Sequence, residues 1–166
     1  MKNIILYSIF FLGSFSMMGQ KSMDALLKKH NLETVEYITV NELKELQSNE
    51  KVILLDSREE QEYKVSHIVS AQCVGYDFFS SEEISEEIIE KDTPIVVYCS
   101  VGIRSEDIGE QLKAKGFTNV KNLYGGIFEW KNQGNSVLDS TQTKTENIHT
   151  FSKSWSKWLK KGNKIY

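Results

Sequence analysis

Apolar residues along the chain follow two alternating patterns, short continuous runs and stretches with helical spacing. Continuous runs rich in valine and isoleucine are typical of strands buried on both faces of a parallel sheet. Such runs lie at residues 37–40, 52–56, 71–76, 94–98 and 119–123. Helical spacing occurs at residues 41–47, 80–90, 105–115 and 127–133. The alternation predicts an α/β domain over residues 35–134, with a central five-stranded parallel sheet and helices on both faces.

The N-terminus has the pattern of a secretory signal peptide. One lysine in residues 1–3 precedes an apolar stretch at residues 4–15 that is too short to span a bilayer comfortably. We expect residues 1–19 to be removed after Gly19 and the protein to be exported to a bacterial periplasm; the alternative is an uncleaved anchor. We expect no lipoprotein anchor, because no cysteine follows the apolar stretch. Residues 20–34 are expected to form a lead-in helix.

The composition changes after residue 134. Residues 135–147 are rich in serine, threonine, asparagine and glutamine without apolar periodicity, and we expect a polar linker there. In residues 148–166, apolar positions fall at helical spacing among lysines, which predicts a basic, aromatic, amphipathic helix. Its apolar stripe consists of Phe151, Trp155, Trp158 and Leu159.

Charge also differs between the two parts of the chain. The formal net charge is −3, but the residues after 134 carry six lysines against Asp139 and Glu146, so the preceding body is acidic. We expect the basic helix to dock its stripe on this body; contact with an anionic membrane surface or a partner protein is the alternative. Nucleic acid is not an expected partner, because the acidic body would repel it.

Cys99 lies in the stretch with the clearest chemical signal. It follows the strand predicted at 94–98, and a helix is expected to begin just behind it with Ser105 as N-cap. The backbone N–H groups of such a loop turn inward, and Gly102 allows it to curl. Together with the charge of Arg104 they would lower the pKa of the Cys99 thiol and favour thiolate. The other loop positions are expected to contribute backbone or shape; they are Ser100, Val101, Gly102, Ile103 and Ser105.

The loop Cys99-Ser-Val-Gly-Ile-Arg104-Ser resembles the active-site loop of single-domain rhodaneses, sulfurtransferases that carry sulfane sulfur as a cysteine persulfide. The resemblance covers roughly residues 35–134 in the family's order and spacing. Before the loop it rests on Leu54-Leu55-Asp56-Ser57-Arg58, Glu62-Tyr63 and Ser66-His67-Ile68 through Ala71. After the loop it rests on Gly116-Phe117, Val120, Leu123 and Gly125-Gly126 through Trp130.

This resemblance implies a ping-pong sulfur transfer through Cys99. A thiosulfate- or persulfide-type donor would supply the sulfur, Arg104 and the loop amides would hold the persulfide, and a thiol or cyanide would accept it. No cofactor and no metal are expected, and we expect a monomer. The six-residue span from Cys99 to Arg104 fits sulfur, because the related phosphatases have one loop residue more. Since Ser100, Val101 and Ile103 are neutral, activity on thiosulfate is expected to be modest.

Asp56 and Arg58, at the end of the strand predicted at 52–56, invite a catalytic interpretation. The resemblance places the nucleophile elsewhere, so we expect a buried salt bridge or a loop hydrogen bond that shapes the active-site face, and we expect Glu62 to be similarly structural. His67 is a tempting general base, but persulfide transfer hardly requires one, because the attacking thiolate is already ionised. We therefore expect a hydrogen-bonded, structural His67 on the same face.

Other functional classes remain as alternatives. A non-catalytic rhodanese-like module could bind an anion or a protein, although the intact Cys99 and Arg104 argue against it. An exported thiol–disulfide protein would use Cys73 together with Cys99. Cys73 itself is expected to be a core residue of the strand at 71–76, with relay of the persulfide as its functional alternative. Phosphatase activity is the most distant possibility.

Overall fold

The structure, a computed structural model, describes residues 23–166. The predicted signal peptide, residues 1–19, lies outside the described residues. Residues 23–32 belong to a separate unit, in which residues 23–30 are helical, within the segment expected to hold a lead-in helix. Glu33–Tyr166 forms the second unit and contains the α/β domain. Among residues 23–166, no helix has the length and apolar character needed to cross a membrane.

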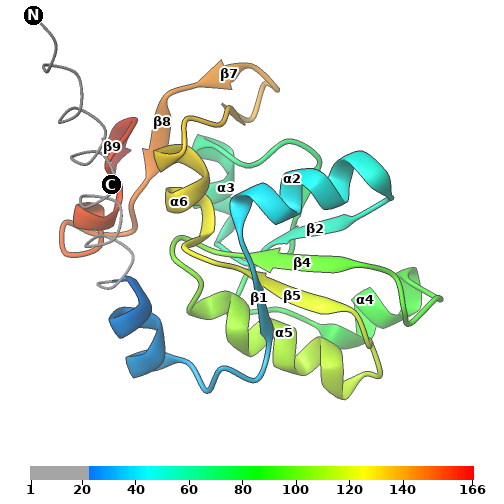
Figure 1. The fold of residues 1–166 in the computed structure, drawn as a ribbon. Helices are drawn as coiled ribbons and strands as arrows, with labels where there is room; N and C mark the ends of the chain where they lie inside the picture. The colour runs from blue at the N-terminus through cyan, green and yellow to red at the C-terminus, as the bar shows by residue number, and fades with distance from the viewer. Residues whose placement is uncertain (1–22) are drawn as a thin grey trace, which may run out of the picture. The chain divides into compact units, whose positions relative to one another are not determined.

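A five-stranded parallel sheet forms the centre of the second unit, with strand order β1-β5-β4-β2-β3 (Figure 1). The strands are β1 (Glu36–Ile38), β2 (Ile53–Asp56), β3 (Ala71–Cys73), β4 (Ile95–Tyr98) and β5 (Val120–Leu123). Four of them lie within the apolar runs that predicted them, and β1 begins one residue before its run, so the predicted parallel sheet is confirmed. Strand β2 pairs with β4 so that Asp56 lies opposite Tyr98, which brings the polar ends of both strands to one edge.

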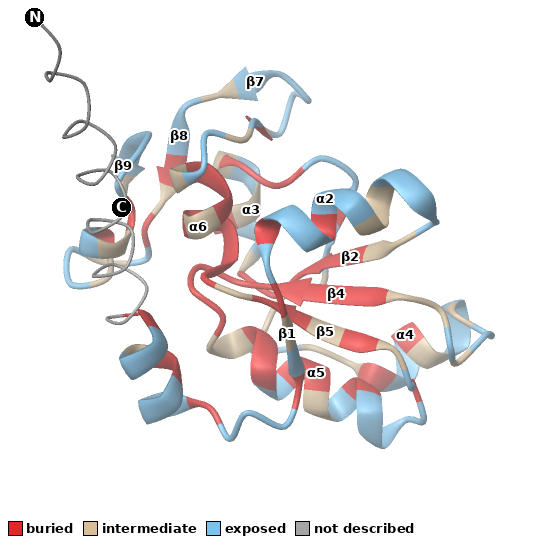
Figure 2. Cartoon of the chain, viewed as in Figure 1, coloured by how far each residue is buried: buried red, intermediate tan, exposed pale blue. Residues whose placement is uncertain are grey.

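Helices cover both faces of this sheet, as predicted. Figure 1 shows α2, α3 and α6 on one side and α4 and α5 on the other. The helices are α2 (Val40–Asn49), α3 (Glu60–Val65), α4 (Ser81–Glu87), α5 (Arg104–Ala114) and α6 (Gly126–Asn132). Side chains alternate between the faces along a strand, so Ile95 and Val97 of β4 pack with Ile108 and Leu112 of α5. Figure 2 shows burial concentrated on the central strands and on the helix surfaces that face them.

Local sequence explains several helix ends. Helix α2 begins after Thr39, whose hydroxyl accepts a hydrogen bond from the Glu42 backbone N–H, while the Glu42 carboxylate accepts one from the Thr39 backbone N–H, a capping box. Ser80 caps α4 by accepting from the backbone N–H of Glu83. Gly116 follows the end of α5 with a φ of 90°. This left-handed conformation, which is open to glycine, ends the helix.

The polar linker predicted at residues 135–147 is wrong. The segment contains an antiparallel pair, β6 (Val137–Leu138) and β7 (Lys144–Thr145). Val137 is fully buried, and the backbone of Leu138 exchanges hydrogen bonds with that of His67 at 2.8 and 2.9 Å. Polar composition concealed the pair because only one of its side chains is fully buried.

The amphipathic helix predicted at residues 148–166 is also wrong. We call residues 147–166 the C-terminal segment; it contains a parallel pair, β8 (Asn147–His149) and β9 (Asn163–Ile165), joined through a short 3-10 turn at Ser156–Trp158. Phe151 has a φ of 62°, a value that no right-handed helix contains. The helical spacing of the aromatic residues therefore does not form one stripe.

The C-terminal segment packs on the domain, as expected, but through aliphatic rather than aromatic side chains. Ile148 and Leu159 are almost completely buried, whereas Phe151 is 58% exposed. The Asn132 amide on α6 donates to the Trp158 carbonyl of the segment at 3.0 Å, and the Lys131 ammonium lies 2.7 Å from Glu146, the residue just before the segment. Strand β8 also packs against α3.

Candidate active site

Cys99 is the first residue after β4, at the carboxyl edge of the sheet, as predicted. It is almost completely buried. The loop that follows curls back because Gly102 adopts a φ of 107°, a left-handed value that suits glycine. This turn directs the Gly102 N–H to the Cys99 sulfur at 3.2 Å. The predicted cradle around the thiol is therefore present.

Opposing effects act on the Cys99 thiol. Burial by itself raises the pKa of the thiol, because a thiolate loses its hydration. The positive charge of Arg104, the backbone N–H groups of Ser105 and Gly102 and the hydroxyl of Ser105 all stabilise the thiolate. These groups outweigh burial, and the pKa of Cys99 lies below that of an ordinary cysteine. The site thus favours a nucleophilic thiolate.

Ser105 is not the N-cap that the sequence predicts. Helix α5 begins one residue earlier, at Arg104, and no side chain caps it. The Ser105 hydroxyl instead lies 3.6 Å from the Cys99 sulfur and donates to the Asn122 side-chain oxygen at 2.8 Å. Asn122 in turn donates to the Gly102 carbonyl at 2.9 Å. This buried amide on β5 fixes the loop. The sequence signal for it was a polar residue within the strand predicted at 119–123.

Arg104 is held by Glu62 on α3. Its guanidinium donates two hydrogen bonds to the Glu62 carboxylate, at 2.8 and 2.9 Å, and a longer one to the Ser100 hydroxyl at 3.3 Å. Burial would raise the pKa of Glu62, but the pairing with Arg104 lowers it below its usual value. Glu62 is therefore an ionised partner that fixes the Arg104 side chain and offsets its charge.

The start of α6 supports the loop from behind. The N–H of Ile127 donates to the Cys99 carbonyl at 2.9 Å, and that of Phe128 donates to the Ser100 carbonyl at 3.2 Å. Such close approach requires a glycine at position 126, because a Cβ there would lie 2.3 Å from the Cys99 carbonyl oxygen. The backbone that carries the thiol is thus fixed on two sides.

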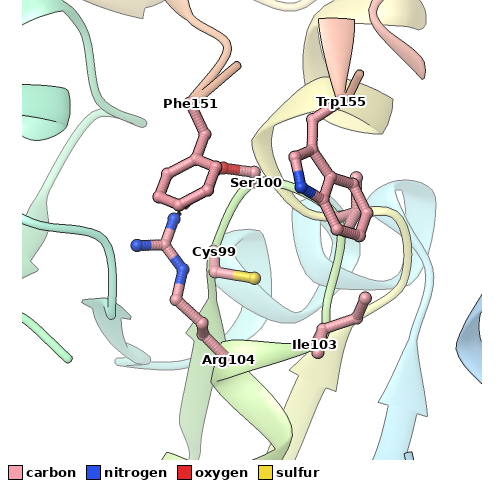
Figure 3. Close-up of a pocket in the computed structure, with 7 residues that line it drawn as sticks. Cys99, Ser100, Ile103, Arg104, Phe151 and Trp155 are labelled. Atoms are coloured by element: carbon pink, nitrogen blue, oxygen red, sulfur yellow. Dashed lines mark hydrogen bonds between the residues drawn. The ribbon is translucent and has the colours of Figure 1, made fainter. Parts of the chain in front are cut away.

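A cavity of about 140 Å³ opens onto Cys99. Figure 3 shows the sulfur directed between Phe151 and Trp155, with the Phe151 ring beside the Arg104 guanidinium. The guanidinium carbon lies 5.4 Å from the centre of that ring, within range of a cation–π contact. The cavity is lined by Cys99, Ser100, Val101, Ile103, Arg104, Phe151 and Trp155. Four predicted loop residues therefore face it beside Cys99, and Phe151 and Trp155 are site residues that the sequence assigned to a docking stripe.

Asp56 and Arg58 form the buried salt bridge that the sequence predicts. Both side chains are completely buried, and the guanidinium donates to both carboxylate oxygens at 2.9 and 2.6 Å. Arg58 also donates to the Ser66 carbonyl at 2.7 Å, which ties the end of β2 to the end of α3. Neither residue lines the cavity at Cys99, so they support the edge of the sheet rather than contact a substrate there.

His67 is a buried structural residue, as predicted. Its ring stacks on Tyr63 with centroids 4.0 Å apart, and its Nδ1 lies 3.2 Å from the Tyr63 carbonyl. Its Nε2 lies 3.3 Å from the Gln142 amide, so both ring nitrogens contact polar groups outside the Cys99 cavity. Among residues 23–166, no group of three or more histidine, cysteine, aspartate or glutamate side chains is arranged to hold a metal ion.

Cys73 is exposed, so its prediction as a core residue is wrong. The geometry also argues against a disulfide with Cys99. Cys73 lies opposite Asp56 on one side of β2, and Tyr98 lies opposite Asp56 on the other. Neighbouring strands are about 4.8 Å apart, so two spacings place Cys73 roughly 9–10 Å from Tyr98, the residue directly before Cys99. A disulfide rarely joins Cα atoms more than about 7 Å apart, and both cysteines are free thiols.

Comparison with known proteins identifies the central part of the chain. A family model described as the rhodanese-like domain matches residues 39–133. The chain is 36% identical over 104 residues to a tRNA uridine(34) hydroxylase from Protochlamydia amoebophila, across 59% of this chain and 32% of that protein. It is 32% identical over 87 residues to the thiosulfate sulfurtransferase GlpE from Coxiella burnetii, across 52% of this chain and 78% of that protein. The match thus spans only about a third of the hydroxylase.

Solved structures share the fold. The rhodanese-like domain from Anabaena sp. matches with a TM-score of 0.56 and 23% identity, over 62% of this chain and 78% of that chain. Thiosulfate sulfurtransferase from Pseudomonas aeruginosa matches with a TM-score of 0.59 and 18% identity, over 85% of this chain and 26% of that one. At these identities the likeness concerns the fold alone. The matched family segment ends at residue 133, before Phe151 and Trp155.

Proposed function

The chain belongs to the family of rhodanese-like domains, and we propose that it is a sulfurtransferase that carries sulfane sulfur as a persulfide on Cys99. One observation carries this proposal most directly. A buried thiol with a lowered pKa lies at the floor of an open cavity, 3.2 Å from the N–H of Gly102. This arrangement stabilises a sulfur anion. Both the attacking thiolate and the resulting persulfide are such anions. The relatedness to the sulfurtransferase GlpE supports the same chemistry.

The reaction proceeds in two transfers. The Cys99 thiolate attacks the outer sulfur of a donor, a new S–S bond forms, and the electron pair of the broken bond leaves with the remainder of the donor. A thiolate or cyanide then attacks the outer sulfur of the Cys99 persulfide, and the electron pair returns to the Cys99 sulfur. No proton needs to move in either transfer, so no general base is needed and His67 can remain structural.

Groups around the loop stabilise the negative charge on sulfur during both transfers. The N–H groups of Gly102 and Ser105 already point at the Cys99 sulfur, and Arg104 lies on the wall of the same cavity. Preorganised donors of this kind stabilise developing charge without reorganising during the reaction. The Glu62 carboxylate acts through Arg104, so we assign Glu62 a positioning role.

Cyanide-dependent thiocyanate formation tests the proposed function. The purified protein is incubated with cyanide and, in parallel reactions, with thiosulfate, an organic thiosulfonate or a low-molecular-weight persulfide. Turnover with at least one donor, abolished in Cys99→Ser and retained in Cys73→Ser, is the expected result. Absence of turnover with every donor from a folded protein would favour the non-catalytic binding module instead.

We also propose that the protein is exported and acts as a monomer. A lysine near the start followed by the apolar stretch at residues 4–15 supports export. N-terminal sequencing of the protein from a bacterial periplasmic fraction tests this proposal, and Gln20 is the expected first residue. Recovery of the intact N-terminus from the membrane fraction would favour an uncleaved anchor.

A further inference from the structure

Phe151 and Trp155, which we call the aromatic pair, add two apolar walls to the cavity at Cys99. Both belong to the C-terminal segment, beyond the residues 39–133 that match the family model. Figure 3 shows the pair on opposite sides of the space into which the Cys99 sulfur points. The loop contributes two further apolar side chains, Val101 and Ile103. A substrate that reaches the thiol therefore passes between aromatic and aliphatic surfaces.

The conformation of Phe151 is not explained by folding alone. Its φ of 62° is an outlier for a bulky side chain, and such conformations are energetically costly. The residue is 58% exposed, so burial of the ring offsets little of that cost. Flanking bonds maintain the conformation: the Phe151 N–H donates to His149 Nδ1 at 3.2 Å, and Thr150 donates to the Ile165 carbonyl at 2.8 Å. Strained residues of this kind cluster at ligand-binding sites.

The cavity is poorly suited to a dianion. Among the described residues that line it, Arg104 is the only cation. The Arg104 guanidinium is already paired with the buried Glu62 carboxylate through two hydrogen bonds and lies beside the Phe151 ring. A second negative charge would lose hydration between apolar walls without a second cation to compensate it. A donor with a single charge meets a smaller penalty.

The size of the cavity suits a small organic group. Its volume of about 140 Å³ is close to that of an apolar cavity of roughly 150 Å³ that binds one benzene molecule. Aromatic rings contact each other favourably in offset or edge-to-face arrangements, which two facing side chains can provide. The volume and the walls therefore fit a single ring.

From these observations we propose that the aromatic pair makes the enzyme selective for organic sulfane donors, thiosulfonates or persulfides with a small apolar or aryl group, over the thiosulfate dianion. This inference rests on the proposed function and names its substrate class. The carbon-bearing group lies between Phe151 and Trp155, while the sulfane sulfur reaches Cys99.

The transfer from an aryl thiosulfonate balances without a further reactant. The Cys99 thiolate attacks the terminal sulfur of the aryl thiosulfonate anion, and the bond between that sulfur and the sulfonyl sulfur breaks. The electron pair leaves with the aryl sulfinate, and Cys99 carries the persulfide anion. Two negative charges are present before and after the step. Cyanide then removes the outer sulfur as thiocyanate and regenerates the thiolate.

The test compares kcat/KM for benzenethiosulfonate and thiosulfate, with cyanide as acceptor, in the wild-type protein and in variants of the aromatic pair. We expect the wild type to prefer benzenethiosulfonate by at least about tenfold, and Phe151→Ala and Trp155→Ala each to lose roughly three- to tenfold of that preference, the range expected for one aromatic contact. Phe151→Gly removes the ring and also relieves the left-handed backbone, so it separates loss of the ring from loss of folding.

Phe78→Ala is the matched control. Phe78 is a 96% exposed aromatic residue that does not line the cavity at Cys99, and its truncation should leave the preference unchanged. Equal use of both donors by the wild type, or a preference that is undiminished in Phe151→Gly and Trp155→Ala, would overturn the inference while leaving the proposed function intact. Absence of transfer from both donors and from a low-molecular-weight persulfide would refute the proposed function, and the inference with it.

Binding gives a readout that does not depend on turnover. In Cys99→Ser, benzenesulfonate serves as a non-reacting aryl probe and sulfate as the dianion, and calorimetry measures both affinities. We expect benzenesulfonate to bind more tightly than sulfate, and Trp155→Ala in the same background to remove the difference. Tighter binding of sulfate would contradict the inference.

Discussion

The guanidinium of Arg104 donates two hydrogen bonds, of 2.8 and 2.9 Å, to the carboxylate of Glu62, a residue that lies 42 positions earlier in the chain. The Glu62 side chain is 2% exposed and that of Arg104 is 18% exposed. The pair connects α3 to the start of α5, directly beside the Cys99 loop. Two-point pairing fixes the orientation of the guanidinium as well as its position.

Glu62→Gln should therefore destabilise the fold. It removes one charge of a largely buried pair and leaves the other poorly compensated, which costs on the order of 3 kcal/mol. Urea unfolding measures the loss. Glu60→Gln on the same helix is the control: its pair with Lys64 is exposed, and its removal should cost less than about 0.5 kcal/mol. Similar losses in the two variants would contradict the assigned role of Glu62.

The pKa values of the two cysteines should differ from that of an ordinary thiol in opposite directions. Burial by itself would raise the pKa of Cys99, but Arg104 and the loop N–H groups lower it. Burial and the negative charge of Asp56 raise the pKa of Cys73. Because the thiolate is the reactive form, alkylation of Cys99 should reach half its maximal rate at a lower pH than alkylation of Cys73. Iodoacetamide kinetics against pH, in Cys73→Ser and Cys99→Ser respectively, measure the two profiles; a reversed order would be inconsistent with the cradle.

Gly126→Ala should impair both stability and sulfur transfer. Both Gly126 and Gly116 have positive φ, so alanine introduces backbone strain of about 1 kcal/mol or more at either position. Only at Gly126 would the new Cβ also collide with backbone, 2.3 Å from the Cys99 carbonyl oxygen; at Gly116 nothing lies within 4 Å. Thermal unfolding and thiocyanate formation should show the larger loss of stability, and the loss of activity, in Gly126→Ala alone. An active Gly126→Ala enzyme would show that the start of α6 does not fix the loop.

Asp56→Asn tests whether the salt bridge with Arg58 is structural. It leaves a completely buried guanidinium without its counter-charge, which should lower the unfolding free energy by about 3–5 kcal/mol. At a temperature where the variant is folded, the alkylation profile of Cys99 should keep its wild-type midpoint. A shifted midpoint in the folded variant would assign Asp56 a direct part in the chemistry of the thiol.

The central sheet and the catalytic loop could be predicted because local sequence encodes them. Runs such as residues 94–98 suit only a buried strand, and Gly102 and Arg104 lie within five positions of Cys99. The partner of Arg104 could not be predicted from spacing, because Glu62 reaches it only through the packing of α3 against the loop. Likewise, Ser105 has the residue type of an N-cap, but the thiol and Asn122 engage its hydroxyl.

The C-terminal segment shows the limit of periodicity. Phe151, Trp155 and Leu159 have helical spacing, but the serines between them are weaker helix formers, and a short isolated helix is marginal in water. Long-range contacts therefore determine the structure. Strand β8 pairs with β9, Leu159 is buried, and the backbone N–H of the next residue, Lys160, donates to the side-chain oxygen of Asn132. Contacts of this kind leave no periodic signal in the sequence.

Intact mass spectrometry of the protein after incubation with a sulfane donor tests the central claim most directly. The wild-type protein and Cys73→Ser should each gain one sulfur, about 32 Da, that cyanide removes, whereas Cys99→Ser should gain none. Benzenethiosulfonate and thiosulfate are used in parallel, so that a poor donor does not hide the chemistry. If Cys99 remains an unmodified, alkylatable thiol with both donors, or if the sulfur resides on Cys73, the assignment of Cys99 as the persulfide carrier is wrong.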